Sequence, residues 1–107
     1  WLFVTDSASN NLYRWPIESD KALGKREVFA TLAGAGNDGI AFDPKGRLWC
    51  CTKGGVVILS PSAETLAVIK MPNKPTSIAF APTPSRMVCI ITRDACYVTE
   101  LASAESS

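Results

Sequence analysis

A carboxylate and an amide stand among three glycines in the string G-A-G-N-D-G, residues 34–39. The string matches G-x-G-x-x-G, whose glycines cradle a dinucleotide's phosphates when a helix follows them. Here the chain continues as I-A-F and then D-P-K-G at 43–46, which predicts a short strand and a tight turn. Because no helix N-terminus is predicted to hold a pyrophosphate, the sequence argues against a nucleotide cofactor.

The side chains of Asn37 and Asp38 are the alternative carriers of chemistry in this string. Amide and carboxylate oxygens are ligands that a hard cation such as Ca²⁺ prefers. From spacing alone, a solvated loop whose glycines permit φ > 0 is the commoner reason for such residues. Other catalytic classes are excluded, since the chain has no histidine for Ser-His-Asp, Cys-His or HExxH chemistry.

Composition limits the partners and the compartment. The chain has 107 residues, enough for one small domain, with 47% hydrophobic residues and a net charge of +1. No long basic run and no apolar stretch of spanning length is present, so neither nucleic acid nor membrane is an expected partner. The four cysteines, Cys50, Cys51, Cys89 and Cys96, form no C-x-x-C pair. We predict buried, reduced thiols, which favours the cytoplasm.

Strand signals dominate the whole chain, and turn residues separate them. The segment 65–71 is ambiguous because Pro61 could begin a short helix, but its neighbours and Pro72 favour a strand. The predicted strands are 2–5, 12–17, 26–32, 40–42, 48–52, 56–59, 65–71, 78–80, 86–92 and 96–99.

The string I-A-F-D-P at 40–44 returns as I-A-F-A-P at 78–82. A period of about 40 residues with up to four short strands predicts a β-propeller, an all-β fold of antiparallel four-stranded blades. The predicted blade units are 1–33, 37–72 and 75–101, followed by a frayed tail at 102–107. About two and a half blades form an incomplete ring, so we expect either part of a longer protein or self-association.

With these motifs in place, the chain resembles the C-terminal part of a six-bladed propeller of the SMP-30/gluconolactonase family, which includes regucalcin and phosphotriesterase-like lactonases. The resemblance rests on L-F-V-T-D-S at 2–7, N-D-G-I-A-F-D-P-K-G-R-L-W at 37–49 and G-G-V-V-I-L-S-P at 54–61. It implies a lactone or ester hydrolase with one divalent metal in the channel, Ca²⁺ first and Zn²⁺ or Mn²⁺ as alternatives.

The resemblance also implies roles for single residues. Asp38 aligns with an aspartate that binds the metal and handles a proton in hydrolysis, so it is the candidate catalytic and metal residue. The family's other ligands, a glutamate and asparagines, have no counterpart in this chain, and Asn37 stands where proline is common. Thr76 and Ser77 occupy the level of Asn37 and Asp38 one blade on, so Asn37, Thr76 and Ser77 are candidate substrate-lining residues.

Because of the missing ligands, we expect the isolated chain to be inactive and to bind metal weakly. The alternative is a non-enzymatic propeller of the NHL-like or strictosidine synthase-like kind that acts as a binding scaffold. Trp49 is expected to pack between blades, and Lys53 and Arg47 to be solvated turn charges. Asp6 and Asp94 are expected to cap turns.

Overall fold

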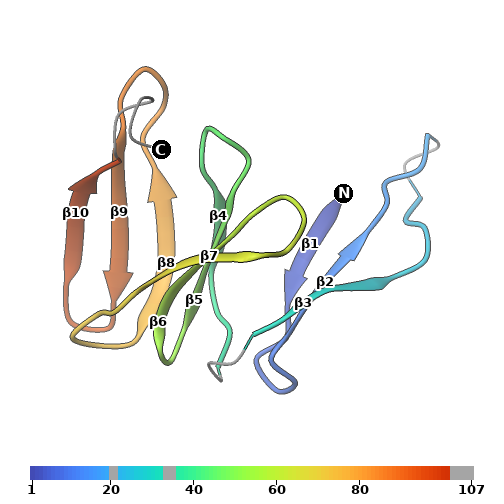
Figure 1. Ribbon diagram of the computed structural model, residues 1–107, viewed down its shortest axis with the longest axis horizontal. Helices are drawn as coiled ribbons and strands as arrows, with labels where there is room; N and C mark the ends of the chain where they lie inside the picture. The colour runs from blue at the N-terminus through green and yellow to red at the C-terminus, as the bar shows by residue number, and fades with distance from the viewer. Residues whose placement is uncertain (20–21, 33–35, 102–107) are drawn as a thin grey trace.

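The computed structural model describes residues 1–19, 22–32 and 36–101. Every regular element in these ranges is a β-strand (Figure 1). The ten strands are β1 (Leu2–Thr5), β2 (Asn11–Trp15), β3 (Glu27–Thr31), β4 (Ile40–Phe42), β5 (Leu48–Thr52), β6 (Gly55–Leu59), β7 (Thr65–Ile69), β8 (Pro75–Phe80), β9 (Met87–Thr92) and β10 (Cys96–Glu100).

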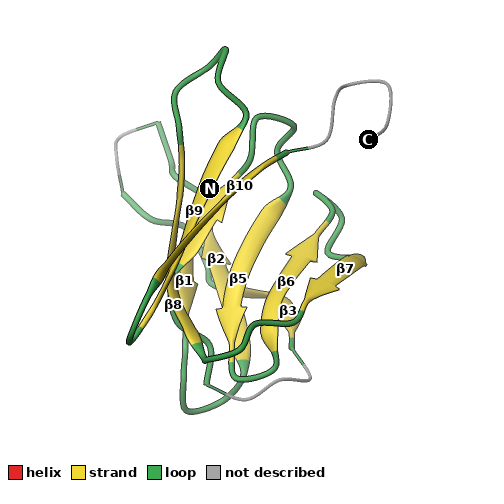
Figure 2. Cartoon of the chain, turned by 90° about the vertical axis from the view of Figure 1, so that its left-hand side faces the viewer, coloured by secondary structure: helices red, strands yellow, loops and turns green. Residues whose placement is uncertain are grey.

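The strands form three antiparallel sheets, in the orders β1-β2-β3, β4-β5-β6-β7 and β10-β9-β8. This confirms the all-β prediction and the three-, four- and three-stranded blades. The sheets stand in sequence as an open arrangement, with the β8–β10 sheet nearest the viewer in Figure 2. The ambiguous segment is strand β7, and the helical alternative is wrong. No helix in the described ranges is long and apolar enough to cross a membrane.

Several strand ends differ from the prediction by one to three residues, and a proline explains two of these differences. Strand β2 stops at Trp15, directly before Pro16, because proline has no N–H to donate to the sheet. Strand β8 begins at Pro75, three residues before the predicted start, and Pro75 pairs with Thr92. Proline is accepted there because it is the first residue of the strand.

The two central strands of the middle sheet, β5 and β6, are buried on both faces, since side chains alternate along each strand. On β5, Leu48 and Cys50 face the β1–β3 sheet, whereas Trp49 and Cys51 face the β8–β10 sheet. Trp49 meets the ring of Phe80 edge to face at 5.2 Å, so its predicted packing between blades is confirmed.

The D-P-K-G turn before β5 contains Asp43, whose side chain is fully buried. Hydrogen bonds to this side chain connect the turn to the core. The Asp43 carboxylate accepts hydrogen bonds from the backbone N–H groups of Lys45 and Arg47 at 2.9 and 3.0 Å. It also accepts from Arg47 Nε at 2.6 Å and Trp49 Nε1 at 3.0 Å. Arg47 is therefore the partner of a buried carboxylate, and the prediction that it is only a solvated turn charge is wrong.

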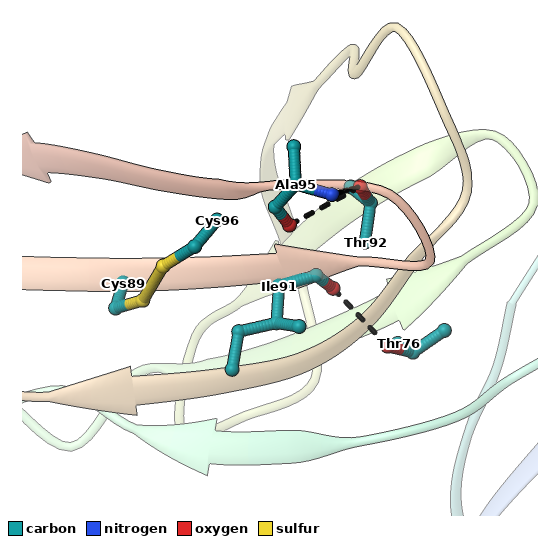
Figure 3. Close-up of a disulfide and its surroundings, with 6 residues drawn as sticks. All are labelled: Thr76, Cys89, Ile91, Thr92, Ala95 and Cys96. Atoms are coloured by element: carbon teal, nitrogen blue, oxygen red, sulfur yellow. Dashed lines mark hydrogen bonds between the residues drawn. A yellow bond between two sulfur atoms is a disulfide. The ribbon is translucent and has the colours of Figure 1, made fainter.

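The cysteines correct one prediction. Cys89 on β9 and Cys96 on β10 form a disulfide across one hairpin (Figure 3), so these two are not reduced thiols. The antiparallel pairing of β9 with β10 brings them together. Cys50 and Cys51 are free and buried, as predicted. The prediction of a cytoplasmic location relied on four reduced thiols, and only Cys50 and Cys51 are free.

Candidate functional site

The candidate residues lie at one end of the sheets. The β5–β6, β7–β8 and β9–β10 connections and the start of β4 all lie toward the lower edge of Figure 1. After Gly39 the chain enters the three-residue strand β4, so the predicted strand replaces the helix that a dinucleotide would need. Gly34 and Ala35 of the glycine string lie outside the described residues.

Gly39 brings the two inner strands β4 and β8 together. Its backbone N–H donates to the carbonyl oxygen of Thr76 at 3.0 Å. A Cβ at this position would lie 2.6 Å from that oxygen and 3.0 Å from the Cα of Ser77, so only glycine fits. The structure therefore brings Asp38 to the level of Thr76 and Ser77, as the repeat predicted.

The backbone of Asp38 is held by a hydrogen bond to β5, whereas its side chain is exposed. Its N–H donates to the carbonyl oxygen of Cys51 at 2.9 Å, and the N–H of Cys51 donates to the carbonyl oxygen of Gly39 at 2.9 Å. The Asp38 side chain is exposed, and its carboxylate makes no hydrogen bond or ion pair with the described residues. A carboxylate on an anchored backbone is available to a ligand.

Asn37 lies in a different environment from its neighbour. It is buried, and its Nδ2 donates to the carbonyl oxygen of Asn11 at 3.4 Å, which ties the β4–β7 sheet to the β1–β3 sheet. Its Oδ1 is buried without a hydrogen-bond partner in the described part of the chain. An unpaired buried carbonyl is costly, so this oxygen is available to a water or a cation.

The hydroxyls of the two candidate residues on β8 also differ. Thr76 Oγ1 donates to the carbonyl oxygen of Ile91 at 3.2 Å (Figure 3), so it links β8 to β9. Ser77 is exposed on the inner strand. Ser77 thus has the more accessible hydroxyl at the level of Asp38.

Two charged side chains act on the thiol of Cys51. Burial is the main reason that its pKa rises to about 12, and Cys50 and Asp38 raise this pKa further, whereas Lys74 lowers it. Burial likewise raises the pKa of Cys50 to about 11. Both thiols stay protonated near neutral pH and are unsuited to nucleophilic chemistry. The carboxylate of Asp38 raises the pKa of both thiols, whereas the ammonium of Lys74 lowers that of Cys51.

A divalent metal fits these residues in part. The described residues contain no group of three or more His, Cys, Asp and Glu side chains able to hold a metal ion. Asp38 supplies one carboxylate, and the unpaired Asn37 Oδ1 is a second oxygen of suitable chemistry. A hard cation takes about six to eight oxygens. Within the described residues, two side-chain oxygens therefore have suitable chemistry, which is fewer than a hard cation takes.

Lys74 and Arg93 are residues that the sequence did not single out. They lie close to the level of Asp38, on the connections that precede β8 and follow β9. The repeat carries a signal for Arg93, since it follows Thr92 as Lys53 follows Thr52. Lys74 has no such signal, because its position depends on how β8 packs against β4.

Comparisons with known proteins agree with this geometry. The family described as "SMP-30/Gluconolactonase/LRE-like region" matches residues 1–93. A 6-deoxy-6-sulfogluconolactonase from Pseudomonas putida is 36% identical over 86 residues, covering 75% of this chain and 30% of that protein. A gluconolactonase structure from Xanthomonas campestris matches with a TM-score of 0.84 at 22% identity, covering 94% of this chain and 33% of that one.

The chain spans about a third of the length of these two relatives. The structural likeness at low identity shows the fold, a β-propeller that is open in this chain. The family match extends over most of the sequence and contains Asp38 and the turn at Asp43. The chain therefore belongs to the SMP-30/gluconolactonase/LRE-like family.

Proposed function

We propose that the protein containing this chain is a divalent-metal-dependent hydrolase of sugar-acid lactones, and that Asp38 is its metal ligand and proton acceptor. The observation that carries the proposal is the exposed carboxylate of Asp38 on a backbone anchored between β5 and β8. The family supports the reaction class. The Pseudomonas relative, which by its name acts on a lactone bearing a sulfo group, supports sugar-acid lactones as the substrate class.

In the proposed reaction, Asp38 positions a water molecule and accepts its proton as the water oxygen bonds to the lactone carbonyl carbon. The ring C–O bond then breaks, and the proton passes to the departing ring oxygen, which becomes a hydroxyl. A bound metal would polarise the lactone carbonyl and stabilise the charge that develops on its oxygen. Ser77, exposed beside Asp38, is a candidate donor to a substrate hydroxyl.

The proposal distinguishes the properties of the 107-residue chain alone from those of the whole protein. Asp38 and Asn37 supply at most a few of the oxygens that Ca²⁺, Zn²⁺ or Mn²⁺ requires, so the 107-residue chain alone is inactive and binds metal weakly. Isothermal titration calorimetry with each metal tests this. We expect dissociation constants in the millimolar range, about the weak end of protein Ca²⁺ sites, and loss of the signal in Asp38→Asn. A micromolar dissociation constant for any of these metals would contradict the expectation that the chain alone binds metal weakly.

A further inference from the structure

A hollow of about 460 Å³ opens beside the level of Asp38, between the β7–β8 and β9–β10 connections. Its lining is Asn73, Lys74, Thr76, Arg93 and Asp94. Two of these side chains carry positive charge and one carries negative charge. Thr76 joins the hollow to the Gly39 contact that positions Asp38. Thr76 is therefore shared by the lining of the hollow and the backbone contact next to Asp38.

Neighbouring sheets build matching hairpins that present cations at this end. The Oγ1 of Thr52 accepts from the N–H of Gly54 and donates to the carbonyl oxygen of Gly55, at 3.1 and 2.9 Å. In the next sheet, Thr92 Oγ1 bonds in the same manner to the N–H and carbonyl oxygen of Ala95, at 3.2 and 3.3 Å (Figure 3).

Both threonines are buried, so each fixes the residue that follows it. Those residues are Lys53 and Arg93. In the β1–β3 sheet the residue after the equivalent Thr5 is Asp6, whose carboxylate accepts from the N–H of Ala8 and the hydroxyl of Ser9. A cation therefore follows this threonine in the β4–β7 and β8–β10 sheets, whereas an aspartate follows it in the β1–β3 sheet.

A glycine allows the two lysines to approach each other. A Cβ on Gly36 would lie 3.1 Å from Lys53 Cγ and 3.4 Å from Lys74 Nζ, and Gly36 has a φ of +73°, which favours glycine. The ion pairs among the described residues use Arg14, Arg47 and Arg86 instead. Lys53 and Lys74 thus approach each other at Gly36, and Lys74 and Arg93 line the same hollow. Like charges repel within a screening length of about 10 Å.

We propose that Lys74, Arg93 and Lys53 form a subsite that binds an anionic substituent of the lactone substrate, such as a phosphate, sulfonate or carboxylate remote from the ring carbonyl. A bound anion would relieve the repulsion among the three cations and accept charge-assisted hydrogen bonds from them. The ring carbonyl would then face Asp38. This inference rests on the proposed function, because the hollow becomes a substrate subsite only if the neighbouring site hydrolyses lactones.

Binding of a non-hydrolysable probe tests the subsite without any catalysis. Sorbitol 6-phosphate, sorbitol and inorganic phosphate are titrated into the chain while amide resonances are followed by NMR. We expect sorbitol 6-phosphate to shift Gly36, Lys74 and Arg93 and to bind at least about tenfold more tightly than either other probe, a difference that two charge-assisted contacts can supply. Equal binding of sorbitol 6-phosphate and inorganic phosphate would overturn the inference in favour of a free-anion site.

Variants identify the contacts. Lys74→Ala and Arg93→Ala should each weaken sorbitol 6-phosphate binding about five- to tenfold. The matched control is Lys25→Ala, which removes an exposed lysine from the β2–β3 connection at the other end of the sheets and should change nothing. Unchanged binding in both test variants would overturn the inference.

Kinetics of the complete protein separate this inference from the proposed function. The ratio of kcat/KM for 6-phosphogluconolactone over gluconolactone should fall about tenfold in Lys74→Ala and stay at the wild-type value in Lys25→Ala. A ratio unchanged by Lys74→Ala would refute the subsite while leaving the lactonase proposal intact. No hydrolysis of either lactone would refute the proposed function, and the NMR titration would still decide whether the cations bind an anion.

Discussion

The middle sheet, β4–β7, and the two flanking sheets contain similar strands but bury their side chains differently. All five residues of the central strand β5 are buried, whereas Leu2 and Val4 on β1 and Ile91 on β9 are exposed apolar side chains. Within the middle sheet, exposed apolar side chains lie on the outer strand β7. The middle sheet has a neighbour on each face, and each flanking sheet has one. A propeller blade therefore completes its core only when blades stand on both sides, and exposed apolar faces of this kind are surfaces for further packing.

The largest difference in stability is expected between replacing a buried leucine of the middle sheet and replacing an exposed leucine of a flanking sheet. Leu48→Ala in the middle sheet removes a side chain that is 1% exposed and should lower the free energy of unfolding by about 3 kcal/mol. Leu2→Ala in the first sheet, where the side chain is 41% exposed, should cost less than about 1 kcal/mol. Urea unfolding followed by tryptophan fluorescence measures both, and equal losses would contradict the difference in burial.

The next contrast is between two aspartates in turns. Asp43→Asn retains the shape but loses the charge that accepts from Arg47 and Trp49, and should cost about 2 kcal/mol. Asp6→Asn, in the exposed β1–β2 turn, is the matched control and should have a smaller effect. The same unfolding measurement applies. A control as damaging as Asp43→Asn would show that the buried turn is not special.

A pH titration tests the same carboxylate. Burial opposes ionisation of Asp43, but hydrogen bonds from Trp49, Arg47 and Lys45 outweigh it and lower its pKa below the usual value. Because this pKa is lower in the folded than in the unfolded state, the stabilisation is complete above about pH 4 and is lost as the pH falls below it. Unfolding free energies from pH 6 to pH 2 should fall less steeply in Asp43→Asn.

The Asp43→Asn variant should still lose some unfolding free energy as the pH falls. The pKa of Asp6 is also lowered, by hydrogen bonds from Ser9 and Ala8, so part of the acid dependence remains in the variant. If wild type and Asp43→Asn lose stability in parallel from pH 6 to pH 2, Asp43 is not held ionised as described.

The last test changes no residue and counts the free thiols of the wild-type chain. In denaturant without reductant, Cys50 and Cys51 should take up an alkylating reagent, whereas Cys89 and Cys96 should not. After reduction all four should react, and in the native state at neutral pH the two buried thiols should react slowly because burial raises each pKa. Mass spectrometry gives the count. Four labels without reduction would contradict the disulfide.

Local sequence patterns were sufficient to predict the strands and their grouping, because turn residues separate alternating apolar runs and the I-A-F-x-P string repeats. The same patterns placed Asp38 at the level of Thr76 and Ser77, which the Gly39 contact confirms. They did not reveal the Cys89–Cys96 bond, since pairing across a hairpin depends on strand register.

The charged part of the candidate site was largely hidden from the sequence. Lys53 was interpreted as a solvated turn charge, and its approach to Lys74 near Gly36 depends on how β4 packs against β8. The burial of Asn37 was equally hidden, because the bond to Asn11 crosses between two sheets. The repeat therefore predicts the level that a residue occupies in its blade, whereas the contacts between side chains of neighbouring blades depend on packing that the spacing does not show.

The most direct test is lactone hydrolysis by the complete protein carrying Asp38→Asn, with metal content measured in parallel. The control is Glu64→Gln, which removes an exposed carboxylate from the β6–β7 turn, at the opposite end of the middle sheet. We predict that Asp38→Asn lowers kcat at least about 100-fold and reduces bound metal, while the control matches wild type. A folded Asp38→Asn protein with wild-type kcat and metal content would contradict the role assigned to Asp38.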